Sequence, residues 1–216
     1  MVHDNPSWRN ADADTVGETK QGIALADAAA AAKVPHVVFN SVGGAERDSG
    51  VPHFHSKYLV EQHLATLGLH RTIVRPVFFV ENFTWMGPSL EDGALVVRLP
   101  IPDGIKLQMI AVRDVGIIAA AALLDPEAVP EVIEIAGDEL TGSEIAAVHG
   151  EKLGLPARYE ALPVAVLDGQ EDLQAMFRWF AETPAYQADL QEVRRIHPNS
   201  WTLQTWLDSN NTLPGN

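Results

Sequence analysis

Two residues of one short segment could move or stabilise a proton. His53 and Lys57 lie four positions apart in a stretch that Pro52 opens and Gly68 closes, a pattern that predicts a helix. An imidazole titrates near neutral pH, so His53 is a candidate general acid. The alternatives are a histidine that packs or caps at the helix N-terminus and, for Lys57, a solvated surface lysine.

The same segment argues against a metal centre. His53 and His55 are two residues apart, so on a helix their side chains face different directions, and no third ligand is evident nearby. The chain also has no cysteine, which excludes disulfides, thiolate catalysis and Cys-ligated metals. We therefore predict no metal site.

Two apolar, β-branched runs must position these side chains. The runs 36–41 and 71–75 are predicted to be buried strands that alternate with helices, which favours parallel pairing through right-handed crossovers. Ligands bind outside the carboxyl ends of parallel strands. Ser41 and Val42 lie at such an end, so they are either site residues or plain strand termination.

The second strand is followed by Pro76 and an aromatic segment. Pro76 fixes φ and removes a backbone donor, which shapes a loop whose backbone could contact a ligand. Phe78 and Phe79 could wall a pocket, although aromatic residues at this density are more often core. Asn82 is either a polar lining residue or a helix N-cap.

The remaining periodicities extend the alternation of helices and strands. A capping-box spacing at Thr15–Glu18 predicts a helix to about Lys33, and a second such spacing begins at Thr141. Further expected strands are 95–97, 107–110, 131–136 and 158–161, and further expected helices are 112–124, 141–154, 163–182, 186–196 and 202–207. We expect an α/β domain over residues 1–137, with helices on both faces of a parallel sheet, and a smaller, mostly helical lobe over residues 138–216.

Composition bounds the function classes. The 216 residues are 46% hydrophobic and 20% charged, a normal globular mix, with a net charge of −14. Such an acidic surface repels phosphate, so direct nucleic-acid binding and binding to anionic membranes are not expected. No apolar run is long enough to span a bilayer, and the first residues show no secretory signal. A cytoplasmic location is the expectation.

Several stretches, in this order and spacing, resemble the NmrA-like family of atypical short-chain dehydrogenase/reductases. They are Gln21-Gly22 with Asp27–Ala29, Phe39–Val42, His53–Lys57 with Glu61, Arg75–Phe79 with Glu81–Phe83, Ile110–Gly116, Ile135–Asp138, and Thr141 with Glu144–Ala146. Each piece alone is weak, but together they cover nearly the whole chain.

The resemblance implies a Rossmann-type domain that holds NAD(P) across the carboxyl ends of its strands. By that likeness, Lys57 would contact the nicotinamide ribose, and His53 stands where the classical members carry the tyrosine proton donor. The implied cofactor-binding residues are Asn40, Ser41, Val42, Lys57, Pro76, Val77, Phe78, Phe79 and Asn82.

The sequence lacks the Gly-rich turn that such a fold uses to hold the pyrophosphate. We expect Met1-Val2 to be the remnant of a fourth strand, an N-terminally truncated sheet, and an open apolar edge at Val37–Ser41. A gene fragment or mis-started product would explain this, as would a protein partner or homodimer that covers the edge. Weak or absent NAD(P) binding follows as an expectation.

Three functions fit these observations. A cofactor-sensing regulator would report redox state through a partner protein, because the usual proton donor is replaced by His53. An oxidoreductase of the quinone-reductase type would suit the apolar segment Phe78–Phe83, with Lys57, water or His53 as proton source. A non-functional fragment is the third reading.

Overall fold

The computed structural model describes residues 14–182 and 184–210, and its centre is a parallel sheet. Strands β1 (Val37–Asn40), β2 (Arg71–Pro76) and β7 (Val132–Ile135) lie in the order β1-β2-β7. Each pairs in parallel with its neighbour, and Phe39 stands opposite Ile73 in the register. The expected α/β fold with a parallel sheet is confirmed.

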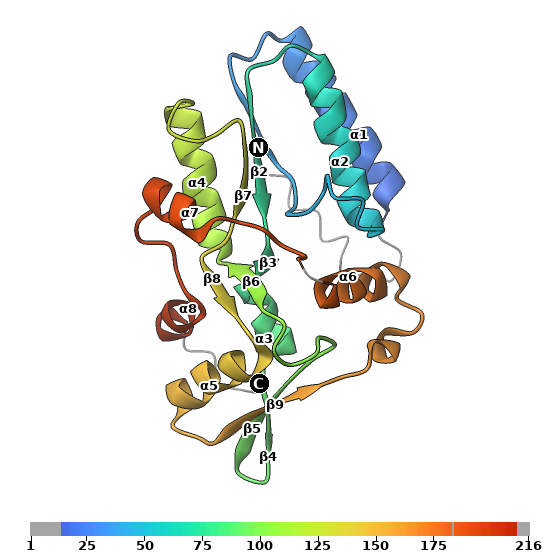
Figure 1. The fold of residues 1–216 in the computed structure, drawn as a ribbon. Helices are drawn as coiled ribbons and strands as arrows, with labels where there is room; N and C mark the ends of the chain where they lie inside the picture. The colour runs from blue at the N-terminus through green and yellow to red at the C-terminus, as the bar shows by residue number, and fades with distance from the viewer. Residues whose placement is uncertain (1–13, 183, 211–216) are drawn as a thin grey trace.

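Helices cover both faces of this sheet. Figure 1 shows α1 (Thr15–Ala31) and α2 (Pro52–Thr66) together on one side of the strands and α4 (Val112–Leu124) on the other. Alternate residues of β2 point to opposite layers. Ile73 is buried in one cluster with residues of α1 and α2, whereas Val74 is buried with residues of α4.

The α1–α2 pair depends on a close approach of the two helices. A Cβ atom built on Gly22 of α1 would lie 2.6 Å from a methyl carbon of Val60 in α2, so a larger residue would force the helices apart. The N-cap of α1 differs from the prediction. Asp14, not Thr15, is the N-cap, and its carboxylate accepts the N–H of Gly17 at 2.7 Å.

Two smaller sheets follow. One has the order β3 (Phe78–Phe79), β6 (Leu107–Ile110), β8 (Asp138–Leu140), and the other β4 (Ser89–Glu91), β5 (Ala94–Leu99), β9 (Ala157–Ala161). Helix α5 (Gly142–Leu153) starts with the predicted capping box, formed by Thr141 and Glu144. The pairs β6–β8 and β5–β9 both cross the domain boundary expected at residue 138.

The last part of the chain is helical but more broken than expected. The segment 163–182 contains a short 3-10 helix (Val164–Leu167), the positive φ of Gly169, and then α6 (Glu171–Ala181). Helix α7 (Leu190–Ile196) begins later than the expected residue 186, and α8 (Leu203–Ser209) follows. Another 3-10 turn (Val80–Asn82) and the short α3 (Phe83–Met86) lie after β3.

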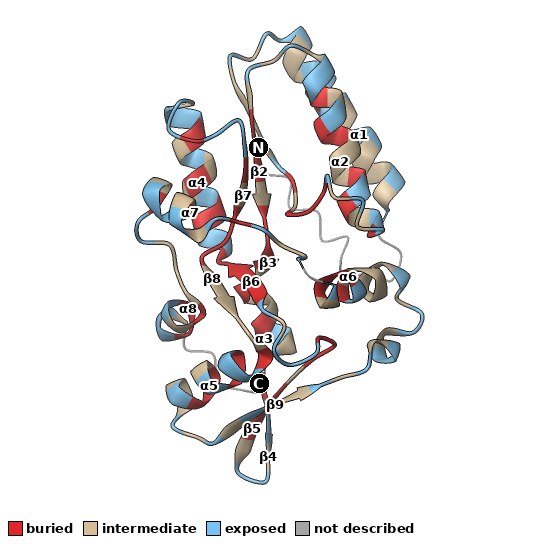
Figure 2. Cartoon of the chain, viewed as in Figure 1, coloured by how far each residue is buried: buried red, intermediate tan, exposed pale blue. Residues whose placement is uncertain are grey.

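Burial differs between parts of the molecule. Figure 2 shows β6 largely in the buried colour and α1 largely exposed or half-buried, with Ala26 the one buried residue of that helix. Among the described residues, β1 pairs with β2 alone, and its residues are half-buried or exposed. The expected strand remnant Met1-Val2 lies outside the described residues.

Candidate functional site

The carboxyl end of β1 is tied to β2 through a buried carboxylate. Ser41 donates its hydroxyl hydrogen to Glu61 Oε1, and Arg75 donates from Nε to the same oxygen at 3.0 Å and from Nη2 to Oε2 at 2.5 Å. Burial opposes the Arg75 charge, but the hydrogen bond and charge of Glu61 outweigh it and raise the Arg75 pKa. The Ser41 side chain is therefore used in a buried hydrogen bond that stabilises the carboxyl end of the sheet.

The loop after β1 extends this chain of alternating charges. Glu46 forms an ion pair with Arg75 at 2.7 Å, and Arg47 forms one with Glu134 of β7 at 2.8 Å. The Arg47 guanidinium also lies 5.8 Å from the centre of the Trp179 ring in α6. The carboxyl ends of all three parallel strands are thus held together by side chains of one loop.

Helix α2 begins at this end of the sheet, because its first residues follow the loop after β1. His53 and Lys57 are four residues apart on it and lie on the same face. The Lys57 ammonium pairs with Glu18 of α1, and Ser56 donates its hydroxyl hydrogen to the other Glu18 oxygen at 2.6 Å. Lys57 is partly exposed and held in one direction by this pair.

His53 has a partner that the sequence did not suggest. Asp172 of α6 accepts the His53 backbone N–H at 2.9 Å through Oδ1, and its Oδ2 lies 2.5 Å from the ring atom Nδ1. Burial would raise the Asp172 pKa, but its hydrogen bonds and ion pair with His53 prevail, so the pKa is lowered. No motif marks Asp172, which reads only as an acidic residue in the first turn of a helix.

The other predicted cofactor residues differ in what they can offer. Asn40 is exposed, and Val42, Phe79 and Asn82 are half-buried. Asn82 precedes α3 at the N-cap position, but its side chain makes no capping hydrogen bond.

Three more of these residues are enclosed. Pro76 is buried, and Val77 and Phe78 are packed in two different hydrophobic clusters. Their backbone is also engaged, because the Pro76 carbonyl accepts from Gly43 at 2.8 Å and Val77 donates to Ile135. A cofactor role for these three residues stays a prediction. It would require backbone carbonyl oxygens that can accept a further hydrogen bond.

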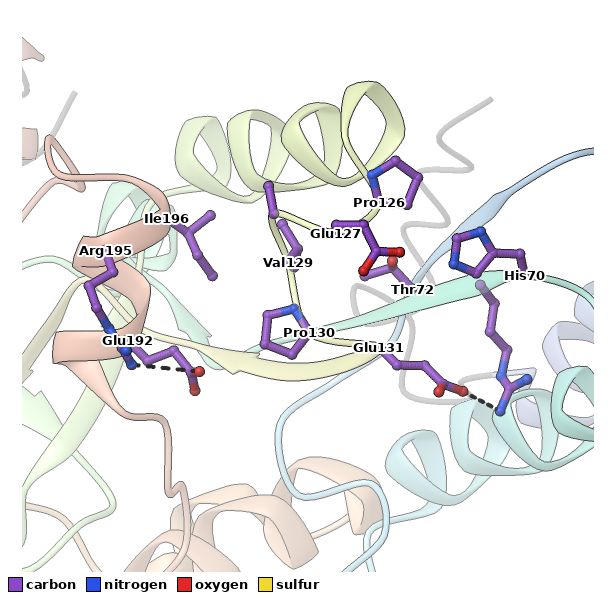
Figure 3. Close-up of a pocket in the computed structure, with 12 residues that line it drawn as sticks. His70, Thr72, Pro126, Glu127, Val129, Pro130, Glu131, Glu192, Arg195 and Ile196 are labelled. Atoms are coloured by element: carbon purple, nitrogen blue, oxygen red, sulfur yellow. Dashed lines mark ion pairs between the residues drawn. The ribbon is translucent and has the colours of Figure 1, made fainter.

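A hollow of about 490 Å³ lies at the opposite, amino end of the sheet. Figure 3 shows residues that line it, among them Arg195, which pairs with Glu192 at 3.7 Å. Arg71, another lining residue, pairs with Glu131 at 2.6 Å. Ligands of open parallel sheets bind at the carboxyl ends. We therefore place the candidate site at His53 and Lys57 and not in this hollow.

Two further properties concern the described residues only. They contain no group of three or more histidine or acidic side chains that could hold a metal ion. None of their helices is both long and apolar enough to cross a membrane.

The fold agrees with comparisons to known proteins. Residues 11–207 match the NmrA-like family, so the chain belongs to the NmrA-like family. An NAD(P)H azoreductase of Xenophilus azovorans is 30% identical over 148 residues, which cover 67% of this chain and 50% of the azoreductase. The chain thus spans half the length of that relative.

Two solved structures show the same fold. NmrA, a negative transcriptional regulator in complex with NAD, has a TM-score of 0.73 and 22% identity, and the match covers 87% of this chain and 68% of NmrA. An NADPH-dependent quinone oxidoreductase from Escherichia coli has a TM-score of 0.73 and 23% identity, with 91% and 79% covered. The proteins that this chain is similar to thus include a regulator and reductases.

Proposed function

We propose that this chain forms the nicotinamide and substrate side of an NAD(P)H-dependent reductase site. The observation that carries the proposal is the placement of His53, which is bound by a carboxylate and lies one helical turn from Lys57. A histidine whose ring is held in one orientation by a carboxylate is suited to act as a general acid, unlike a freely rotating surface histidine. The azoreductase and quinone oxidoreductase similarities support the same reaction class.

The residues present fit one part of the cofactor. Lys57 offers a partly exposed ammonium and Asn40 an exposed amide at the carboxyl end of the sheet, which suit the hydroxyls of a nicotinamide ribose. The sequence has no Gly-rich turn for the pyrophosphate. The fit therefore covers the nicotinamide ribose and not the phosphates, and we expect weak binding by this chain.

The chain's own residues supply orientation and a proton. When bound, the reduced nicotinamide supplies a hydride. Lys57 would hold the ribose hydroxyls, and His53 would donate the proton that neutralises the negative charge on the substrate oxygen or nitrogen. The charge chain from Glu61 to Glu134 keeps the three strand ends in register behind this site.

Turnover tests the proposal. We would measure NADPH oxidation by the 216-residue chain with a panel of quinones and azo dyes, at NADPH concentrations high enough to offset weak binding. Turnover above the rate without protein is expected with at least one acceptor. Binding of NADPH without turnover of any acceptor would refute the reductase and favour the second function.

The second candidate function is a cofactor-sensing regulator. It is favoured by the ion pair of Lys57 with Glu18, which holds the lysine in place when no substrate is bound. The similarity to the regulator NmrA also favours it. The net charge of −14 argues that such an effect would pass through a protein partner and not through DNA contact. Equal binding of oxidised and reduced cofactor would count against a redox sensor.

A further inference from the structure

Helices α2 and α6 are joined by hydrogen bonds as well as by side-chain packing. Helix α2 has no capping side chain of its own, because its N-cap residue is Val51 and Pro52 occupies the first turn. Asp172, 119 residues further along the chain, takes over this role by accepting the His53 N–H at 2.9 Å. Phe54 packs edge-on against Trp179 of α6 with ring centres 5.2 Å apart, which fixes the two helices beside each other.

The second oxygen of the same carboxylate binds the ring. Asp172 Oδ2 lies 2.5 Å from Nδ1, so a proton on Nδ1 is held between them. The Asp172 side chain is only 18% exposed and the His53 side chain 22%, so water competes poorly for this bond. Among the described residues, Nε2 of His53 has no hydrogen-bond partner.

We propose that Asp172 is the positioning residue of the His53 proton donor, an inference that rests on the proposed reductase function. Asp172 keeps Nδ1 protonated and leaves the Nε2 proton available to the substrate. In the imidazolium form both nitrogens carry protons, and the carboxylate balances the positive charge. When the Nε2 proton passes to the reduced substrate, the ring is left neutral with its Nδ1–H still bound, and solvent water restores the Nε2 proton.

A capping role alone would explain the backbone contact but not the ring contact. The variant Asp172→Asn separates the two roles, because the amide oxygen can still accept the His53 N–H and the side-chain volume is unchanged. The amide NH₂ would then face Nδ1 and donate to it. The neutral ring would be forced to carry its proton on Nε2, and the imidazolium would lose its carboxylate partner.

Nitrogen NMR of the His53 ring measures the position of this proton directly, without cofactor or substrate. Long-range ¹H–¹⁵N spectra of the full chain report which nitrogen of the neutral His53 ring carries the proton. We expect Nδ1–H in the wild type and Nε2–H in Asp172→Asn. The matched control is Asp168→Asn, an exposed residue just before α6 that accepts from Gln174, which should leave the His53 signals unchanged.

Kinetics then distinguishes this inference from the function beneath it. With NADPH and an accepted quinone, Asp172→Asn should lower kcat at least about 100-fold while the KM for NADPH changes little. A wild-type ring protonated on Nε2, or a variant with changed tautomer and unchanged kcat, would overturn the positioning role. A wild type with Nδ1–H but no turnover would refute the reductase and leave the ring orientation standing.

Discussion

Glu61 holds Arg75 through both carboxylate oxygens while its Oε1 also accepts the hydroxyl hydrogen of Ser41. The side chains of Glu61 and Arg75 are only 6% and 12% exposed. One carboxylate therefore joins α2, the end of β1 and the end of β2. Because the pair is buried, its loss is costly in a way that loss of a surface pair is not.

The first prediction concerns this carboxylate. Glu61→Gln removes the charge that balances Arg75 and should lower the free energy of unfolding by about 3 kcal/mol. Glu131→Gln is the matched control, since Glu131 pairs with Arg71 but is 62% exposed, and it should change stability by less than about 1 kcal/mol. Urea unfolding of both variants checks the contrast, which fails if the two losses are equal.

The second prediction concerns the buried His149 of α5, whose pKa is lowered to about 4 by burial. The unfolded chain takes up a proton near the ordinary value of 6.5 and the folded chain does not. The free energy of unfolding should therefore fall by about 3 kcal/mol as the pH drops from about 6.5 to 4, and this part of the loss should then stop.

Replacement of His149 tests that sign. In His149→Leu this contribution to the pH dependence should disappear, because no group at the position titrates, and stability near pH 5 should exceed that of the wild type. His55→Gln, which alters an exposed histidine of α2, should keep the wild-type pH profile. Denaturant unfolding at a series of pH values reports both, and a wild-type slope in His149→Leu would contradict the burial argument.

The third prediction concerns the ammonium on the site face of α2. Lys57→Met should weaken NADPH binding about tenfold, because a charge-assisted donor to the ribose is lost. Lys152→Met, on α5, removes a lysine of similar exposure that pairs with Asp208 and should leave the affinity unchanged. Calorimetric titration measures both, and equal affinities for wild type and Lys57→Met would remove Lys57 from the site.

The fourth prediction concerns the edge of β1. Val37 donates its N–H to the carbonyl of His70, just before β2, and Ser41 donates its N–H to Val74 of β2. The intervening Val38 therefore turns its N–H to the other side of the strand. If a second copy pairs there, the chain should self-associate with rising concentration, and Val38→Pro should reduce this by removing the donor. Sedimentation velocity over a concentration series measures this self-association. A monomer at every concentration would argue against pairing at this edge.

The sequence predicted the elements whose signals are local. The apolar run 36–41, the parallel alternation and the capping box at Thr141 all have short-range causes, and the structure has them. The break at Gly169 was missed because the surrounding residues keep a helical composition.

The contacts of the candidate site could be predicted only in part, for a physical reason. His53 and Lys57 stand out by their spacing on one helix, but Asp172 is 119 residues away and its contact is created by tertiary packing of α6. Val77 and Phe78 illustrate the converse. Their place after a strand suggested contact with a ligand, whereas packing in two hydrophobic clusters decides where their side chains go.

The most direct test of the account compares two histidines of one helix. NADPH-dependent reduction of an accepted quinone would be measured for wild type, His53→Gln and His55→Gln at equal concentrations. We expect that His53→Gln loses at least about 100-fold in kcat while His55→Gln keeps the wild-type rate. Equal rates in all three proteins would show that His53 is not the proton donor and would contradict the proposed site.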